Sequence, residues 1–129
     1  MFDVVREGYR QIAATLWPGK TSADSVAAGK FIHDTGYDVY GGYLQGMLGA
    51  NPRHELQIGP DRPQSAEDRY LYDEQGRLLY KAGMMFTLQL HIVDKQETRG
   101  LFLADSFVVT PNGPKCLNKF PPHLVQVGR

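Results

Sequence analysis

The chain has 129 residues, of which 42% are hydrophobic and 22% are charged, so it is long enough to bury the core of one domain without cross-links. Disordered chains combine low hydrophobicity with a large net charge, whereas here 14 basic residues balance 14 acidic ones. This balance makes nucleic acid an unlikely partner, because nucleic-acid-binding proteins carry a basic excess. The basic side chains that could form a local patch on the expected sheet are Arg69, Arg77, Lys81, Lys95 and Arg99.

The single cysteine and the N-terminus bear on where the protein resides. One cysteine, Cys116, cannot form an internal disulfide and favours a reducing compartment. The segment 1–7 lacks the basic start and apolar core of a signal peptide. No apolar run reaches the roughly 20 residues that a membrane-spanning helix needs. We therefore expect a cytoplasmic protein with no membrane association.

The first 48 residues predict helices. Apolar residues recur with helical spacing over residues 2–17, where a proline and a glycine end the pattern. Thr21 and Asp24 have the spacing of a helix start, and the second helix is expected to extend to His33. A third helix is predicted over residues 38–48, although three glycines in it lower helix propensity.

Strands are predicted after a long connection. Residues 49–68 are rich in turn-forming Gly, Pro, Asn, Asp and Ser, which indicates an irregular segment with one candidate edge strand at 54–58. From residue 69 the apolar period changes from 3.6 to 2. The expected strands are a hairpin of 70–72 and 78–80 around the turn 73–76, then 84–93, a central strand at 101–110, and 115–120.

Helices followed by consecutive strands are typical of the α+β class. We predict a single domain over residues 1–129, with a helical part at 1–48, the irregular connection at 49–68 and an antiparallel sheet at 69–129. Two or three helices would pack on one face of a sheet of four to five strands. If the sheet is curved, the result is a cone-like roll of the kind used by nuclear-transport-factor-2-like proteins.

The candidate catalytic residues are Asp105 and His91. Asp105 falls in line with apolar neighbours, and a carboxylate on an apolar face must be hydrogen-bonded, paired or neutralised. In a sheet-lined pocket such a group would act as a general acid or base. His91 would be its partner, although the two residues need not share a face of the sheet. The alternative is that Asp105 bonds a neighbouring tyrosine or a backbone group.

Tyrosines suggest a binding surface, because tyrosine is enriched in interfaces. Three of them lie three residues apart in the predicted third helix region, and three more lie along the predicted hairpin. The alternative is that they cover the edge of the core. The candidate binding residues are Tyr37, Tyr40, Tyr43, Tyr70, Tyr72 and Tyr80.

Metal and nucleotide motifs give weak signals. The sequence Gly19-Lys20-Thr21 resembles the end of a phosphate-binding loop, but Ala14 stands where that loop needs a glycine. The histidines, at positions 33, 54, 91 and 123, have no neighbours at metal-ligand spacing. We therefore predict no metal site and no cofactor.

Two functions from different classes follow from these patterns. The first is a non-catalytic protein-binding or accessory module, similar in kind to bacterial or phage inhibitor and immunity proteins, that uses its tyrosine-bearing surface on a partner or in a homodimer. The second is a small-molecule-binding roll, or an isomerase- or hydrolase-like enzyme, with Asp105 as acid/base. The missing catalytic motifs favour the first, so we lean against an enzyme.

Overall fold

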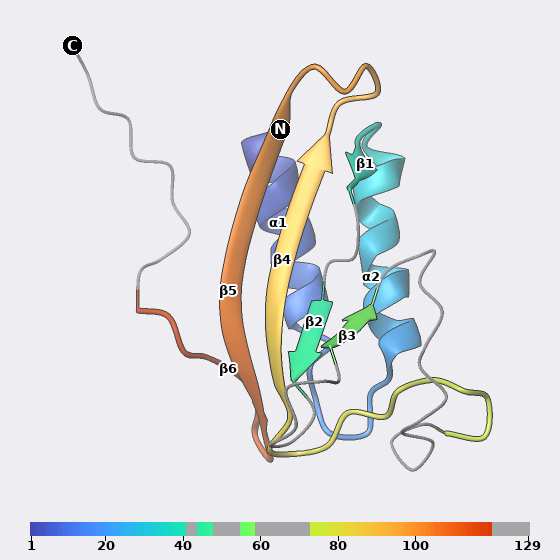
Figure 1. The fold of residues 1–129 in the computed structure, drawn as a ribbon, viewed down its shortest axis with the longest axis vertical. Coiled ribbons are helices and arrows are strands. Elements are labelled where there is room, and N and C mark those ends of the chain that lie inside the picture. The colour runs from blue at the N-terminus through green and yellow to red at the C-terminus, as the bar shows by residue number, and fades with distance from the viewer. Residues whose placement is uncertain (41–43, 48–54, 59–72, 120–129) are drawn as a thin grey trace.

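The computed structural model of the chain describes residues 1–40, 44–47, 55–58 and 73–119 (Figure 1). Its elements are, in chain order, α1 (Phe2–Ala13), α2 (Ser22–Asp34), β1 (Asp38–Val39), β2 (Leu44–Met47), β3 (Glu55–Ile58), β4 (Met85–Val93), β5 (Gly100–Thr110) and β6 (Gly113–Cys116). The strands form one antiparallel sheet in the order β3-β2-β4-β5-β6, with β1 also paired to β4. Both helices lie on one face of this sheet (Figure 1). The predicted α+β class is confirmed.

The first two predicted helices are present, but the third is wrong. Residues 38–48 contribute the strands β1 and β2, both of which pair with β4. Leu44 is opposite Leu88 and is completely buried. Sheet pairing therefore outweighs a helical spacing that three glycines had already weakened. The predicted edge strand is confirmed as β3, which ends the strand order; the rest of the irregular segment lies outside the described residues.

The predicted hairpin is confirmed only at its turn. Gly76 has the positive φ of 72° expected there and donates a hydrogen bond to the carbonyl of Asp73 at 2.9 Å. After the turn, Leu79 makes an isolated bridge to Thr21, the residue before α2. The other arm of the predicted hairpin, 70–72, lies outside the described residues. Residues 77–80 thus join the turn to α2.

The core lies between the sheet and the helices. Side chains of β4 alternate as predicted, and Phe86, Leu88, Leu90 and Ile92 are buried on the face toward the helices. Each such side chain stabilises the fold by about 1.5–3 kcal/mol through burial. Helix α1 packs close to α2 at Gly8, where a methyl group would come within 2.8 Å of an Ile32 side-chain atom.

The loop after α1 is held against the far end of the sheet. A Cβ atom on Gly113, at the start of β6, would lie 2.5 Å from the ring of Trp17. Gly113 also has a φ of +106°, which favours glycine. Both the space beside Trp17 and the backbone conformation therefore favour glycine at position 113. The contact connects the α1–α2 loop to the β5–β6 turn.

Candidate functional site on the open face of the sheet

The sheet has one face that neither helix covers, and side chains from three strands or strand ends meet on it. The strand register places Thr87 opposite Ser106, Gln89 opposite Ala104 and His91 opposite Phe102. All of these are partly or well exposed, in contrast to their buried neighbours along β4. We call this set the open face; its members are Tyr40, Thr87, Gln89, His91, Phe102, Ala104 and Ser106.

One end of the open face is aromatic. The ring of His91 lies 5.4 Å from that of Tyr40 and 5.9 Å from that of Phe102, both in edge-to-face orientation. A backbone hydrogen bond of 2.8 Å from the Tyr40 amide to the His91 carbonyl fixes the end of β1 beside β4. Gly100 lies under the histidine, since a Cβ there would be 3.3 Å from its Nε2 atom.

The middle of the open face is polar. Thr87 and Ser106 are opposite each other and present hydroxyl groups, and Gln89 presents an amide beside the small side chain of Ala104. The backbone carbonyl of Ser106 accepts a hydrogen bond from the Leu117 amide at 2.8 Å, which ties the segment after β6 to β5. Hydroxyls and amides of this kind can bond the backbone groups of a bound peptide.

Asp105 lies on the opposite, helix-covered face. Its carboxylate accepts a short hydrogen bond from the Tyr9 hydroxyl of α1, and both residues are 7% exposed. Burial, and then the bond to Asp105, raises the pKa of Tyr9 well above its usual range. Because strand alternation points His91 to the open face, the sheet separates the two predicted catalytic residues. Of the two interpretations of Asp105, the structure shows the bond to a tyrosine.

The predicted binding tyrosines do not form one surface in the described residues. Tyr80 is completely buried, its hydroxyl lies 2.7 Å from the Ser25 hydroxyl, and its ring packs 5.1 Å from that of Phe86. Tyr37 packs partly buried against the core, and Tyr40 belongs to the open face. The three others, Tyr43, Tyr70 and Tyr72, lie outside the described residues.

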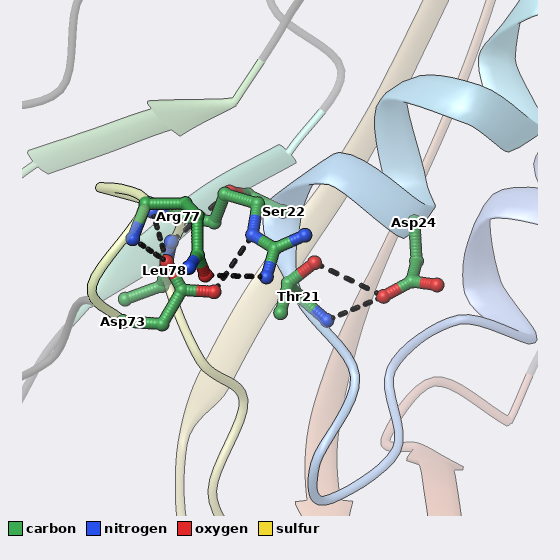
Figure 2. A network of polar contacts seen from close by, with 7 residues as sticks. Thr21, Ser22, Asp24, Asp73, Arg77 and Leu78 are labelled. Carbon is green, nitrogen blue, oxygen red and sulfur yellow. Dashed lines mark hydrogen bonds and ion pairs between the residues drawn. The ribbon is translucent and has the colours of Figure 1, made fainter.

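A polar network joins the turn before β4 to the start of α2 (Figure 2). The Asp24 carboxylate accepts the backbone N–H of Thr21 at 2.7 Å, which confirms the predicted helix start and lowers the pKa of Asp24. Asp73 accepts the backbone N–H of Arg77 at 2.8 Å and its guanidinium at 2.7 Å, and the backbone bond is the main cause of its lowered pKa. The Leu78 backbone N–H donates to the Ser22 hydroxyl at 3.1 Å, and this bond connects the segment after the turn to α2.

The basic residues that could have formed a patch are divided between the two ends of β4. Arg77 and Lys81 precede this strand, and Lys95 and Arg99 follow it. Nine residues of strand separate the pairs by about 30 Å. Arg69 lies outside the described residues. These four residues therefore do not form one basic surface.

Two kinds of feature are absent from the described residues. No group of three or more His, Cys, Asp or Glu side chains in them has an arrangement that could hold a metal ion. None of the helices in the described part of the chain has the length and apolar character that crossing a membrane requires.

The fold of this chain is similar to parts of several peptidases of known structure. The chain is similar to a dipeptidase from Mycobacterium ulcerans (23% identity, TM-score 0.65, covering 95% of this chain and 30% of that one). It is also similar to the prolidase from Pyrococcus horikoshii (19%, 0.67, 96% and 32%) and to methionine aminopeptidase from Rickettsia prowazekii (13%, 0.63, 88% and 49%). No family model matches the sequence. No curated protein matches it either.

These similarities show a shared fold and correct the predicted function. The chain spans about a third of the length of the dipeptidase and the prolidase. Its structural neighbours are peptidases, which contradicts the expectation of a non-catalytic binding or inhibitor-type module. They also give no support to the nuclear-transport-factor-2-like roll.

The residues of the open face were only partly visible in the sequence. The polar alternation of Thr87, Gln89 and His91 along an otherwise apolar strand was a usable signal. Phe102 and Ser106 gave none, because the segment 101–110 is apolar at most positions on both faces. The spacing around Tyr40 predicts a helix, whereas the residue follows the strand β1.

Proposed function

We propose that this chain forms part of a peptidase-like hydrolase that acts on short peptides, and that its open face lines the substrate site. The observation that supports this is the fold, which matches a dipeptidase, a prolidase and an aminopeptidase over 88–96% of the chain. The open face adds hydrogen-bonding groups and a histidine on a rigid pair of strands, while the other face is filled by helices.

Three open-face residues have a role in the proposed reaction. His91 would take a proton from a water molecule whose oxygen attacks the carbonyl carbon of the peptide bond. The hydroxyls of Thr87 and Ser106 lie about 14 Å further along the sheet and would bind backbone groups of the peptide away from the reacting carbonyl. When the carbon–nitrogen bond breaks, the proton passes from His91 to the leaving amine, so that the histidine returns to its starting state.

Amino-acid release from dipeptides tests the proposal. We expect the purified chain to hydrolyse at least one of Ala-Ala, Ala-Phe and Ala-Pro. The variant His91→Ala should reduce the rate about 100-fold or more, as is usual when a general acid or base is removed. His33→Ala is the matched control, because His33 lies on α2, where it pairs with Asp38 at 3.2 Å.

The controls separate the possible outcomes. His33→Ala should hydrolyse the same peptide at an unchanged rate. A rate that falls equally in both histidine variants would show a loss of folded protein. If no amino acid is released from any of the three peptides, at peptide concentrations that saturate the protein, the proposal is wrong. Asp105→Asn belongs in the same series, since acid/base chemistry by Asp105 would appear as a loss of rate with retained folding.

A homodimer and a cytoplasmic location are further parts of the proposal. β3 and β6 end the strand order, so each has an edge with no strand partner among the described residues, and such edges favour association. Cys116 is an exposed free thiol, which suits a reducing compartment. Light scattering at micromolar concentration tests the dimer, and a monomeric mass would remove it.

A further inference from the structure

The aromatic end of the open face has unusual exposure. Tyr40 is 66% exposed and Phe102 is 58% exposed, the two highest values among the exposed large hydrophobic residues of the described part of the chain. Both contact the ring of His91 on β4. Tyr40 follows β1 and Phe102 lies on β5, and each of these two strands pairs with β4. We call these three residues the aromatic cluster.

The aromatic cluster is held in place by the backbone rather than by a covering layer. Tyr40 is fixed through the backbone bond to the His91 carbonyl, and Phe102 is fixed opposite His91 by the β4–β5 register. The bare backbone of Gly100 lies next to the Nε2 atom of His91. Three rings are thus fixed side by side on the sheet, with much of the surface of Tyr40 and Phe102 in water.

The neighbouring polar groups indicate what such a subsite would receive. Gln89 is two residues from His91 on β4, and Thr87 is two residues further, so the polar groups begin about 7 Å from the aromatic cluster. That spacing is close to the distance between a peptide backbone and the end of a large side chain. Rings in edge-to-face contact favour a further ring over an aliphatic group of the same size.

We propose that the aromatic cluster is the subsite that selects an aromatic side chain in a short peptide. The inference rests on the proposed function in taking a short peptide as the ligand. The aromatic side chain packs against Tyr40 and Phe102, and the backbone of the peptide lies along Gln89, Thr87 and Ser106. The proposal makes Tyr40 and Phe102 specificity-determining residues, distinct from the proton transfer assigned to His91.

Binding of two dipeptides, measured by NMR titration, tests this subsite. Ala-Phe should bind the unaltered chain more tightly than Ala-Ser. Phe102→Ala should weaken Ala-Phe about five- to tenfold, the size of one aromatic contact, and should leave Ala-Ser unchanged. Tyr40→Ala should have the same selective effect, since its backbone bond to His91 does not involve the side chain.

Met85→Ala is the matched control, because Met85 is also exposed on this side of β4 but at the opposite end of the strand. It should bind both dipeptides as the unaltered chain does. An equal affinity for Ala-Phe and Ala-Ser, or an equal loss in Phe102→Ala and Met85→Ala, would overturn the subsite.

The result is separable from that of the proposed function. Selective binding of Ala-Phe without hydrolysis would leave the subsite intact and remove the hydrolase. Hydrolysis that proceeds equally well with Ala-Phe and Ala-Ala, and is unaffected by Phe102→Ala, would retain the hydrolase and remove the subsite.

Discussion

The two faces of the sheet differ in what their side chains contact, although the same two strands supply both. On the covered face, Leu88 and Leu90 are completely buried against the helices. On the open face, Gln89 and His91 of the same strand stand partly exposed. Because successive residues of a strand point in opposite directions, nine residues of β4 serve both purposes. The covered positions of β4 therefore stabilise the fold, and the open positions are free of the helices and are the ones that we propose contact a ligand.

Two truncations on β4 give the largest expected difference between the covered face and the open face. Leu90→Ala on the covered face should lower the free energy of unfolding by about 2–5 kcal/mol, through lost burial and the cavity that remains. Met85→Ala on the open side, where the side chain is 46% exposed, should stay within about 0.5 kcal/mol. Urea denaturation of the three proteins measures both values.

Equal losses in the two variants would contradict the assignment of the faces. That outcome would mean that another layer covers Met85 as fully as the helices cover Leu90. The slope of the denaturation curve is the internal control, since a change in it would show an altered unfolded or native state instead of altered packing.

The buried pair of Tyr9 and Asp105 is a polar contact on the otherwise apolar covered face, so it tests whether a polar bond also stabilises that face. Tyr9→Phe should cost about 1–3 kcal/mol, since it leaves a buried carboxylate without its donor. Asp105→Asn keeps an acceptor for the tyrosine hydroxyl and should cost less. Urea denaturation at pH 7 measures the order of the two, and a larger cost for Asp105→Asn would contradict a structural role for this bond.

The raised pKa of Tyr9 also predicts a loss of stability in alkali. The tyrosine of the unfolded chain ionises near its ordinary value of 10.0, whereas the folded one keeps its proton to higher pH. The folded state then binds more protons, so its stability is fully present below pH 10 and falls as the pH rises above it. In Tyr9→Phe this part of the decline should disappear.

Much of the fold could be predicted from the sequence, because long periodic segments reveal their partners. The covered positions of β4, from Phe86 to Ile92, and the start of α2 at Thr21 followed from spacing alone. The prediction of a third helix was wrong because the short strands β1 and β2 gain their stability from pairing with β4, whose residues lie 38 to 55 positions away along the chain. Local spacing does not report such pairing.

The candidate site was harder to predict than the fold. Asp105 is a visible candidate in the sequence because a carboxylate among apolar residues is unusual, but its partner Tyr9 lies 96 residues away. The open face joins the end of β1 with two long strands, and its members become neighbours only through the register of the sheet. Phe102 gave no signal, since an apolar residue in an apolar segment is equally compatible with either face.

The start of α2 gives the smallest expected effect, and it tests whether the covered face depends on how its covering helix begins. Asp24→Ala removes the carboxylate that accepts the Thr21 backbone N–H and should cost about 1 kcal/mol. The pKa of Asp24 is lowered by this bond, so its contribution is present above the ordinary Asp range and is lost as the pH falls through the lowered pKa. Asp3→Ala is the control, because Asp3 in the first turn of α1 makes only an exposed pair with Arg6. If the two variants lose the same stability in urea at pH 7, and the loss in Asp24→Ala does not shrink in acid, the capping bond does not anchor α2, and the packing at Gly8 must hold that layer against the sheet.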